Sequence, residues 1–285
     1  VPEGTPIFLQ EPEPNYYIVK GKPVTITCRA SPAVVINFRC LGMWYSAKSQ
    51  VNEERIDPAT GRKYFQASIE IPQDVVLEYY GSDGYRCECH AINMIPGTNE
   101  RLSAVSRKGL VEEAYLRKSF PQEPMNTAVE LHSSAQLQCR PPKGVPTPQV
   151  FWLKDGVELD TYNEINYIIS SEGNLIISQT TAAEAGNYTC GAQNLAKRVL
   201  SDSATLTIYQ NGKWGTWGPW SECSTKCGKG YQRRSRPCNN PAPMHDGADC
   251  VGEAVQRVPC SSVCPISGMW STWSSWSTCA PDCRH

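Results

Sequence analysis

The chain has 285 residues, a formal net charge of −1 and 14 cysteines, an even number. Cysteines at this density favour a disulfide framework in an oxidising compartment and argue against a cytosolic protein. The near-neutral charge argues against bulk binding of nucleic acid, and no apolar run reaches the roughly eighteen residues that a membrane-spanning helix needs.

Residues 1–113 predict an immunoglobulin-like β-sandwich. Residues 24–28 (VTITC) read as one cysteine-bearing strand, and residues 83–87 (DGYRC) read as the turn into a second. Such a domain buries the inward-facing residues of both sheets and stabilises them with a disulfide.

This first domain has two cysteines more than the pattern requires. Cys40 lies twelve residues after Cys28, and Cys89 lies two residues after Cys87, on the same strand face. Spacing alone does not choose between two arrangements, Cys28–Cys87 with Cys40–Cys89 or the crossed alternative.

The same segment raises and then weakens a metal hypothesis. Cys87, Cys89 and His90 have a spacing seen in zinc sites, but no second half-site follows, so disulfides are favoured. The four histidines form no HExxH motif, and the chain contains neither a nucleophile elbow nor a P-loop. We therefore expect no metal, no cofactor and no catalytic activity.

Most candidate ligand-binding residues of the first domain lie in residues 38–45. Arg39, Trp44 and Tyr45 are of the types enriched in interface hot spots, and Tyr64 is a further candidate. The competing interpretation is that Trp44 replaces the core tryptophan that this domain lacks.

Residues 114–211 predict a second immunoglobulin-like sandwich. Cys139 precedes Trp152 by thirteen residues, and Tyr188 stands two residues before Cys190, as in a strand-B cysteine, a strand-C tryptophan and a tyrosine corner. A disulfide closing a loop of about fifty residues should stabilise the domain by roughly 3–4 kcal/mol. Asn187 begins the sequon NYT and is the predicted N-glycosylation site.

Residues 212–265 predict a stack of alternating side chains. Trp214, Trp217 and Trp220 recur every third residue, which places them on one side of an extended chain with about three residues per turn. Arg234 and Arg236 share a strand face, where their guanidinium planes can lie between indole rings.

This segment resembles the thrombospondin type 1 repeat, a thin three-stranded extracellular module. The resemblance implies the pairs Cys223–Cys260, Cys227–Cys264 and Cys238–Cys250, and it places Gln232 where a third stacking arginine often lies. Residues 266–285 repeat the tryptophan spacing and resemble the start of a second repeat.

The resemblance also implies covalent modification of tryptophan. The W-x-x-W pattern of these repeats signals C-mannosylation, here of Trp214, Trp217, Trp270 and Trp273. O-fucosylation is not expected, because Lys226 and Asp282 stand where the acceptor hydroxyl would be.

Basic residues are unevenly distributed along the chain. Residues 213–285 carry 8 basic and 5 acidic side chains, whereas the rest of the chain is acidic on balance. Lys197, Arg198, Lys229 and Arg233 are the candidate contacts for sulfated glycans such as heparan sulfate. The competing interpretation of each cluster is an ordinary solvated surface.

The order of the modules is similar to the ectodomain of netrin receptors of the uncoordinated (UNC) class. Family-like phrases are RASPA at 29–33, AYLRK at 114–118, QCRPP at 138–142, NYTC at 187–190 and CNNPAP at 238–243. The resemblance implies the crossed bridges Cys28–Cys89 and Cys40–Cys87, in addition to Cys139–Cys190.

Membership of this family would imply an elongated all-β rod that binds netrin in repulsive axon and cell guidance. It would place the chain on the extracellular side of the plasma membrane, in a single-pass parent protein whose span lies outside this chain. Heparan sulfate and other cell-surface proteins are further expected partners, and nucleic acid is not. The alternative is a matrix or adhesive protein built from the same modules.

Overall fold

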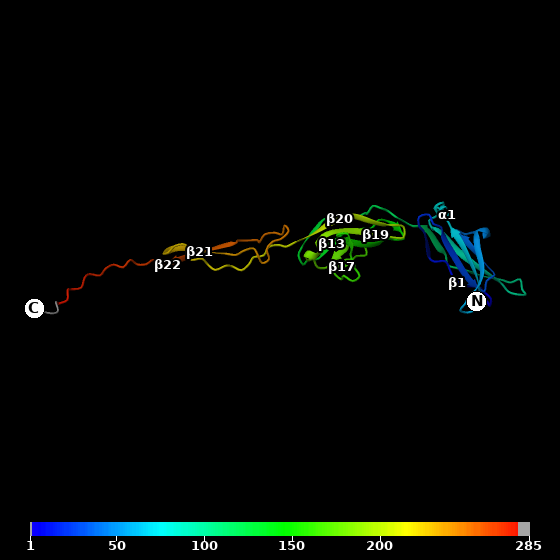
Figure 1. Ribbon diagram of the computed structural model, residues 1–285, viewed down its shortest axis with the longest axis horizontal. Coiled ribbons are helices and arrows are strands. Elements are labelled where there is room, and N and C mark those ends of the chain that lie inside the picture. The colour runs from blue at the N-terminus through cyan, green and yellow to red at the C-terminus, as the bar shows by residue number, and fades with distance from the viewer. Residues whose placement is uncertain (1, 279–285) are drawn as a thin grey trace. The chain divides into compact units, whose positions relative to one another are not determined.

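The computed structural model describes residues 2–278 and is almost entirely β-structure. The chain divides into two compact units, residues 1–208 and 209–285. The first unit contains two sandwiches in sequence, and the second contains the thin repeat (Figure 1). The predicted fold class, two immunoglobulin-like sandwiches followed by a thrombospondin type 1 repeat, is confirmed.

The first sandwich consists of two sheets packed face to face. Most of the strand pairs in these sheets are antiparallel. One sheet has the order β1 (Ile7–Gln10), β3 (Val24–Ser31), β7 (Lys63–Ile71), β6 (Gln50–Ile56). The other has the order β2 (Asn15–Ile18), β10 (Gly109–Glu113), β8 (Tyr85–Met94), β4 (Val35–Cys40), β5 (Met43–Trp44), with β9 (Arg101–Val105) also on β8. The pair β2–β10 is parallel. A single helical turn, α1 (Gln73–Leu77), precedes β8.

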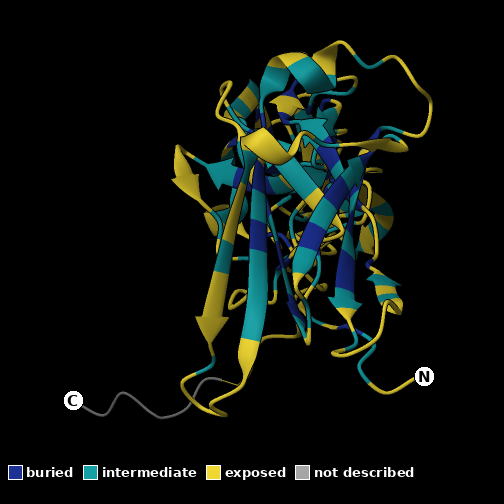
Figure 2. Ribbon diagram, turned by 90° about the vertical axis from the view of Figure 1, so that its right-hand side faces the viewer, coloured by how far each residue is buried: buried dark blue, intermediate teal, exposed yellow. Residues whose placement is uncertain are grey.

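Alternation of side chains produces this domain's core. Buried residues alternate with more exposed ones along most of β3 and along β8 as far as Ala91, as expected for strands with one face against a second sheet. Figure 2 shows buried residues as dark blue bands along the strands. Ile26, Phe38 and Ile69 are among the fully buried side chains, from strands of both sheets. Phe38 thus takes the central position that a tryptophan occupies in the second sandwich.

The second sandwich has a five-stranded and a three-stranded sheet. The larger has the order β12 (Thr127–Glu130), β20 (Arg198–Tyr209), β19 (Gly186–Gln193), β15 (Gln149–Lys154), β16 (Val157–Glu158). The smaller has the order β13 (Ala135–Leu137), β18 (Leu175–Ile177), β17 (Tyr167–Ile169), and β11 (Tyr115–Leu116) pairs with β14 (Gly144–Val145).

The core of the second sandwich contains the predicted tryptophan and tyrosine. Trp152 is fully buried and its indole N–H donates to the Gly173 carbonyl at 3.0 Å. The Tyr188 hydroxyl donates to the Glu184 carbonyl at 2.6 Å, which makes the tyrosine corner. Burial, followed by the neighbouring Tyr167 hydroxyl, raises the pKa of Tyr188 well above its ordinary value, so this hydroxyl remains a neutral donor.

The thin repeat has two β-strands and a third segment of different geometry. Strands β21 (Gly228–Ser235) and β22 (Val255–Ser262) form an antiparallel pair (Figure 1). Beside β21, the amides of Gly215, Gly218 and Ser221 donate to the carbonyls of Pro237, Ser235 and Arg233, each at 2.8 Å. Every third residue of one segment therefore bonds to every second residue of the other.

Candidate functional sites

Two arginines and three tryptophans form a continuous stack in the repeat. The Cζ atom of Arg234 lies 4.8 Å from the Trp217 ring centre and 4.7 Å from that of Trp220. The Cζ atom of Arg236 lies 4.4 Å from the Trp214 ring centre and 4.5 Å from that of Trp217. Each guanidinium thus lies between two indole rings, in the range where cation–π attraction is strong.

Hydrogen bonds from the edges of the stack hold it on the strands. Arg234 Nε donates to Gln256 Oε1 at 2.9 Å, and Arg236 Nε donates to the Glu253 carbonyl at 3.2 Å. The Trp214 indole donates to the Val251 carbonyl at 2.8 Å. Gln232 lies two residues before Arg234 on the same, partly buried face of β21. Both stacking arginines thus have rings over their faces and donate through Nε within the repeat.

Six disulfides lie within the described residues, and they are the pairs that the resemblance implies. They are Cys28–Cys89, Cys40–Cys87, Cys139–Cys190, Cys223–Cys260, Cys227–Cys264 and Cys238–Cys250. Cys279 and Cys283 lie outside the described residues.

The strand register explains the crossed pairing in the first domain. Cys40 on β4 lies directly opposite Cys87 on β8, with the two Cα atoms 4.1 Å apart, so this bridge joins adjacent strands of one sheet. Cys89 faces inward on the same strand and reaches Cys28 on β3 across the core. Cys87 and Cys89, the two cysteines considered as zinc ligands, are therefore both disulfide-bonded. Residues 2–278 contain no group of three or more His, Cys, Asp and Glu arranged to hold a metal ion.

The four candidate ligand-binding residues of the first domain do not form one surface. Arg39 and Trp44 are paired across β4 and β5, and the Arg39 Cζ lies 5.7 Å from the Trp44 ring centre. Tyr64 is on β7 of the other sheet, where Arg29 lies over its ring at 5.6 Å. Tyr45 is half-buried against the core, and its hydroxyl donates to the Glu70 carbonyl at 2.8 Å.

The alternative that Trp44 fills the core is wrong. Trp44 is 59% exposed; the His90 ring meets it in a T-shaped contact with the ring centres 4.7 Å apart, and Arg39 lies over its ring. Phe38 fills the core instead because it faces inward on β4, whereas Trp44 follows a turn at Leu41 and Gly42 that reverses the chain. Trp44 and Arg39 are thus an exposed aromatic–cation pair.

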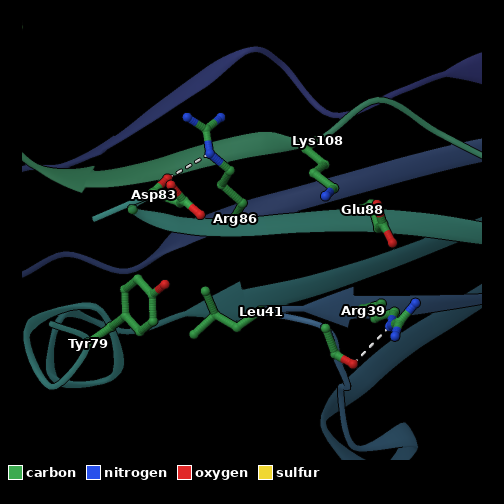
Figure 3. A pocket seen from close by; sticks show the side chains of 9 residues that line it. Arg39, Leu41, Tyr79, Asp83, Arg86, Glu88 and Lys108 are labelled. Atoms are coloured by element: carbon green, nitrogen blue, oxygen red, sulfur yellow. Dashed lines mark hydrogen bonds between the residues drawn. The ribbon is translucent and has the colours of Figure 1, made fainter. Parts of the chain in front are cut away.

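Sequence reasoning did not place two further cations, Arg86 and Lys108, beside Arg39 (Figure 3). Arg86 on β8 and Lys108 just before β10 line, with Arg39, a hollow of about 420 Å³. The signal for Arg86 was present, since the residue between Cys87 and a buried Tyr85 must face outward on a strand. Lys108 lies beside this hollow only because β10 pairs with β8, a strand distant from it in sequence.

The glycan candidates fall into two groups with different surroundings. Lys229 and Arg233 lie on the exposed face of β21, and Arg257 of β22 is directly opposite Arg233. Lys197 is exposed in the turn before β20. Arg198, by contrast, lies 3.7 Å above the Phe151 ring and pairs with Glu158 at 2.8 Å.

The modification candidates are accessible in different degrees. Asn187 is exposed on β19. Its backbone N–H donates to Asp155 Oδ1 at 2.9 Å, and its side-chain oxygen accepts from the Thr205 hydroxyl. Trp270 and Trp273 are fully exposed, whereas Trp214 and Trp217 are covered by the stack.

Comparison with known proteins agrees with these modules. Residues 1–105 match the netrin receptor unc-5 N-terminal domain, residues 119–194 an immunoglobulin domain and residues 215–264 a thrombospondin type 1 domain. Netrin receptor UNC5D of Rattus norvegicus and that of Mus musculus are each 41% identical over 284 residues, which is 100% of this chain and 29% of each relative.

The solved structures found in comparison include tandem immunoglobulin domains. The tandem Ig repeats of Dlar are 22% identical with a TM-score of 0.31 and cover 72% of this chain and 98% of their own. Titin domains I67–I69 are 15% identical with a TM-score of 0.40 and cover 92% and 90%. No helix among residues 2–278 is long and apolar enough to cross a membrane. The unc-5 family model matches residues 1–105, and the identity to two proteins described as netrin receptor UNC5D extends over the whole chain, so this chain is similar to that family along its entire length and spans 29% of those relatives.

Proposed function

We propose that this chain is the ligand-binding extracellular region of a receptor that responds to netrin in repulsive axon and cell guidance. The observation that carries the proposal is the 41% identity over the whole chain to proteins described as netrin receptors. A receptor of this kind binds rather than catalyses, and it presents these domains on the outer side of the plasma membrane.

Netrin contacts the immunoglobulin-like domains rather than the thrombospondin repeat. A specific interface buries about 1,000 Å² or more and is anchored by a few aromatic and arginine side chains. The first domain offers Arg39 beside the exposed Trp44, whereas the repeat uses Arg234 and Arg236 within its own stack. Tyr64 and Tyr45 contribute less, because one lies on the other sheet and the other packs against the core.

A fragment experiment tests this assignment. Netrin is immobilised and titrated with the whole chain, with residues 1–211 and with residues 212–285. We expect the first two to bind with similar affinity and the third not to bind. Binding by the third fragment alone would move the ligand site to the repeat. Binding by none of the three would favour the alternative, a matrix or adhesive protein of the same modules.

A second proposed partner is heparan sulfate, on the exposed face of β21 and β22. Like charges directly opposite each other in an antiparallel pair destabilise it, and Arg233 faces Arg257 in this way. Lys229 extends the same face, and Tyr231 lies between them with the Arg257 Cζ 5.7 Å from its ring centre. A polyanion would neutralise this cluster.

Heparin retention tests the second partner. Exposed ionic contacts are screened beyond about 8 Å at physiological ionic strength, so retention should fall steeply with salt. Joint replacement of Lys229, Arg233 and Arg257 by glutamine should lower the eluting salt concentration more than Lys197→Gln with Arg198→Gln. The opposite order would place the glycan on the second sandwich, and retention that does not depend on salt would contradict an ionic site.

We also propose that the secreted chain carries an N-glycan on Asn187 and C-linked hexoses on Trp214, Trp217, Trp270 and Trp273. The exposed Asn187 side chain supports the first assignment. Intact-peptide mass spectrometry of protein secreted from animal cells is the measurement, and unmodified tryptophans there would contradict the second.

A further inference from the structure

A loop of the second sandwich presents a tyrosine to solvent. Residues 159–166 connect β16 to β17 through a series of turns, just before the strand labelled β17 in Figure 1. Tyr162 lies near the middle of this loop and is 95% exposed. Among the described residues, none forms a hydrogen bond with the Tyr162 hydroxyl. The phenol oxygen is therefore accessible to an enzyme.

Hydrogen bonds to Asp160 hold the turn that carries this tyrosine. Asp160 Oδ1 accepts the backbone N–H of Tyr162 at 3.2 Å and that of Asn163 at 3.1 Å. The Asp160 carbonyl accepts the backbone N–H of Glu164 at 2.9 Å. This is the local bonding by which aspartate favours turns. The side chain of Asn163 and then its backbone N–H lower the pKa of Asp160, so the carboxylate that organises the turn is charged.

The sequence around Tyr162 is acidic. Within five positions on either side there are three acidic residues, Glu158, Asp160 and Glu164, and no basic residue. Glu158 is paired with Arg198 at 2.8 Å. No ion pair joins Asp160 or Glu164 to a cation in the part of the chain that the structure describes. The tyrosine therefore lies in a local negative field.

The other exposed tyrosines have different neighbours. Among the described residues, only Tyr80 equals Tyr162 in exposure, at 94%, and it has two acidic and no basic residues within five positions. Tyr231 has five basic residues and no acidic one in the same window, and Tyr115 has two of each. Tyr162 thus combines the greatest exposure with the most acidic surroundings.

We propose that Tyr162 is a site of tyrosine O-sulfation in the secretory pathway. The donor is phosphoadenosine phosphosulfate, an activated sulfate. The Tyr162 oxygen forms a bond to the sulfur, and the bond between that sulfur and the donor's phosphate oxygen breaks. This phosphate oxygen leaves with the electron pair as part of adenosine bisphosphate, and the phenol proton passes to a base of the sulfotransferase. Such enzymes select exposed tyrosines with acidic neighbours, as expected where a basic cleft binds the substrate.

The disulfides favour sulfate over phosphate as the added group. Six disulfides indicate passage through an oxidising secretory compartment, where tyrosine sulfation takes place, whereas most tyrosine kinases act in the cytosol. The modified loop would carry a further negative charge beside Asp160 and Glu164. This inference goes beyond the proposed receptor function and does not depend on netrin being the ligand.

Peptide mass spectrometry of the whole chain secreted from animal cells tests the proposal. The N-glycan is removed first, because no basic residue separates Tyr162 from Asn187 and trypsin leaves both on one peptide. We expect a sulfate on this peptide that resists phosphatase and is absent when chlorate blocks synthesis of the donor. Tyr162→Phe should lose the sulfate and still fold, since it removes only an exposed hydroxyl. Tyr231 and Tyr115 should stay unmodified.

Two results would overturn this assignment. One is an unmodified Tyr162 in cells that sulfate a co-expressed reporter protein. The other is a group on Tyr162 that phosphatase removes.

Replacing the acidic neighbours tests why this tyrosine is selected. Whole chain from chlorate-treated cells is incubated with a tyrosylprotein sulfotransferase and the activated sulfate. Asp160→Asn with Glu164→Gln should lower the rate of transfer to Tyr162 by about tenfold or more, because opposite charge raises encounter rates by at least that factor. Asparagine keeps a side-chain oxygen that can accept the two backbone N–H groups of the turn.

Glu172→Gln is the matched control, because Glu172 is exposed and lies ten positions after Tyr162. Its rate of sulfate transfer should equal that of the unchanged chain. Equal rates for the double variant and the unchanged chain, or faster transfer to Tyr80 than to Tyr162, would contradict selection by the acidic neighbours and overturn the proposal.

Discussion

In the thrombospondin repeat each of two arginines lies between two indole rings, whereas in the first immunoglobulin-like domain Arg39 lies over only one, that of Trp44. The repeat is too thin to build an apolar core, so contacts between arginine and tryptophan side chains stabilise it instead. The sandwich has a core of its own, so the same residue types can face outward. An arginine held between two rings is therefore committed to the structure of the repeat, whereas Arg39, over one ring, keeps its other face uncovered by an aromatic ring.

The largest expected effect lies in a sandwich core. Trp152→Ala should lower the free energy of unfolding of the second domain by about 3–5 kcal/mol, since a large buried side chain leaves a cavity. The Gly173 carbonyl would also lose its donor. Chemical denaturation of the whole chain, followed by a probe in that domain, measures the change. A loss as small as that of a surface variant would contradict the core assignment.

A smaller loss is expected in the stack. Arg234→Ala removes contacts to two rings and should cost roughly 1–4 kcal/mol, taking about 0.5–2 kcal/mol for each cation–π contact at exposed to desolvated sites. Arg233→Ala is the matched control, because Arg233 is the next residue along β21 and lies on its exposed face. Thermal unfolding of residues 209–285 should separate the two variants; equal effects would reject the register of the stack.

A pH-dependent effect of smaller size is expected at Asp155. The amide of Asn187 and then the side chain of Lys154 lower the pKa of the Asp155 carboxyl from its ordinary value of 3.8. Because the folded pKa is below the unfolded one, the stabilisation is present above pH 3.8 and is lost as the pH falls through the folded pKa. Asp155→Asn should therefore lower the denaturation midpoint at neutral pH, and should lower it by less near pH 3, where the unfolded carboxyl is largely protonated.

Asp202→Asn is the control for this pH dependence, because Asp202 is exposed on β20, a neighbouring strand. The control should change the midpoint by little at either pH. A loss for Asp155→Asn that is the same at both pH values would show that charge does not matter there.

The smallest effect on stability is expected for Trp44→Ala, within about 0.5 kcal/mol, as for most exposed substitutions. The same change should weaken netrin binding by at least about tenfold if Trp44 is an interface anchor. Met43→Ala is the control, since Met43 is its exposed neighbour on β5. Equal netrin affinity of the two variants would remove Trp44 from the proposed interface, and a large loss of stability would contradict its exposed position.

Local patterns in the sequence were sufficient to predict the modules. The alternation around Cys28 and Cys190, and the spacing of Trp214, Trp217 and Trp220, reflect geometry within single strands. The site was harder to predict, because it depends on pairing between distant strands. Arg257 meets Arg233 and Lys108 reaches the side of Arg39 only once the register is fixed. Tyr64 and Arg39 were both candidates for the same binding surface from sequence, but they belong to different sheets.

The hydrogen bonds from Gly215, Gly218 and Ser221 to Pro237, Ser235 and Arg233 set a rule for how this repeat can change length. One layer corresponds to three residues on the tryptophan segment and two on β21. Inserting three residues on one side and two on the other, with two more on β22, would add a layer and keep every indole in place. A single inserted residue between Trp214 and Trp220 would instead rotate the segment by about one third of a turn and direct the next indole away from its arginine. The repeat can therefore gain or lose whole layers, but only when the tryptophan segment, β21 and β22 change length together.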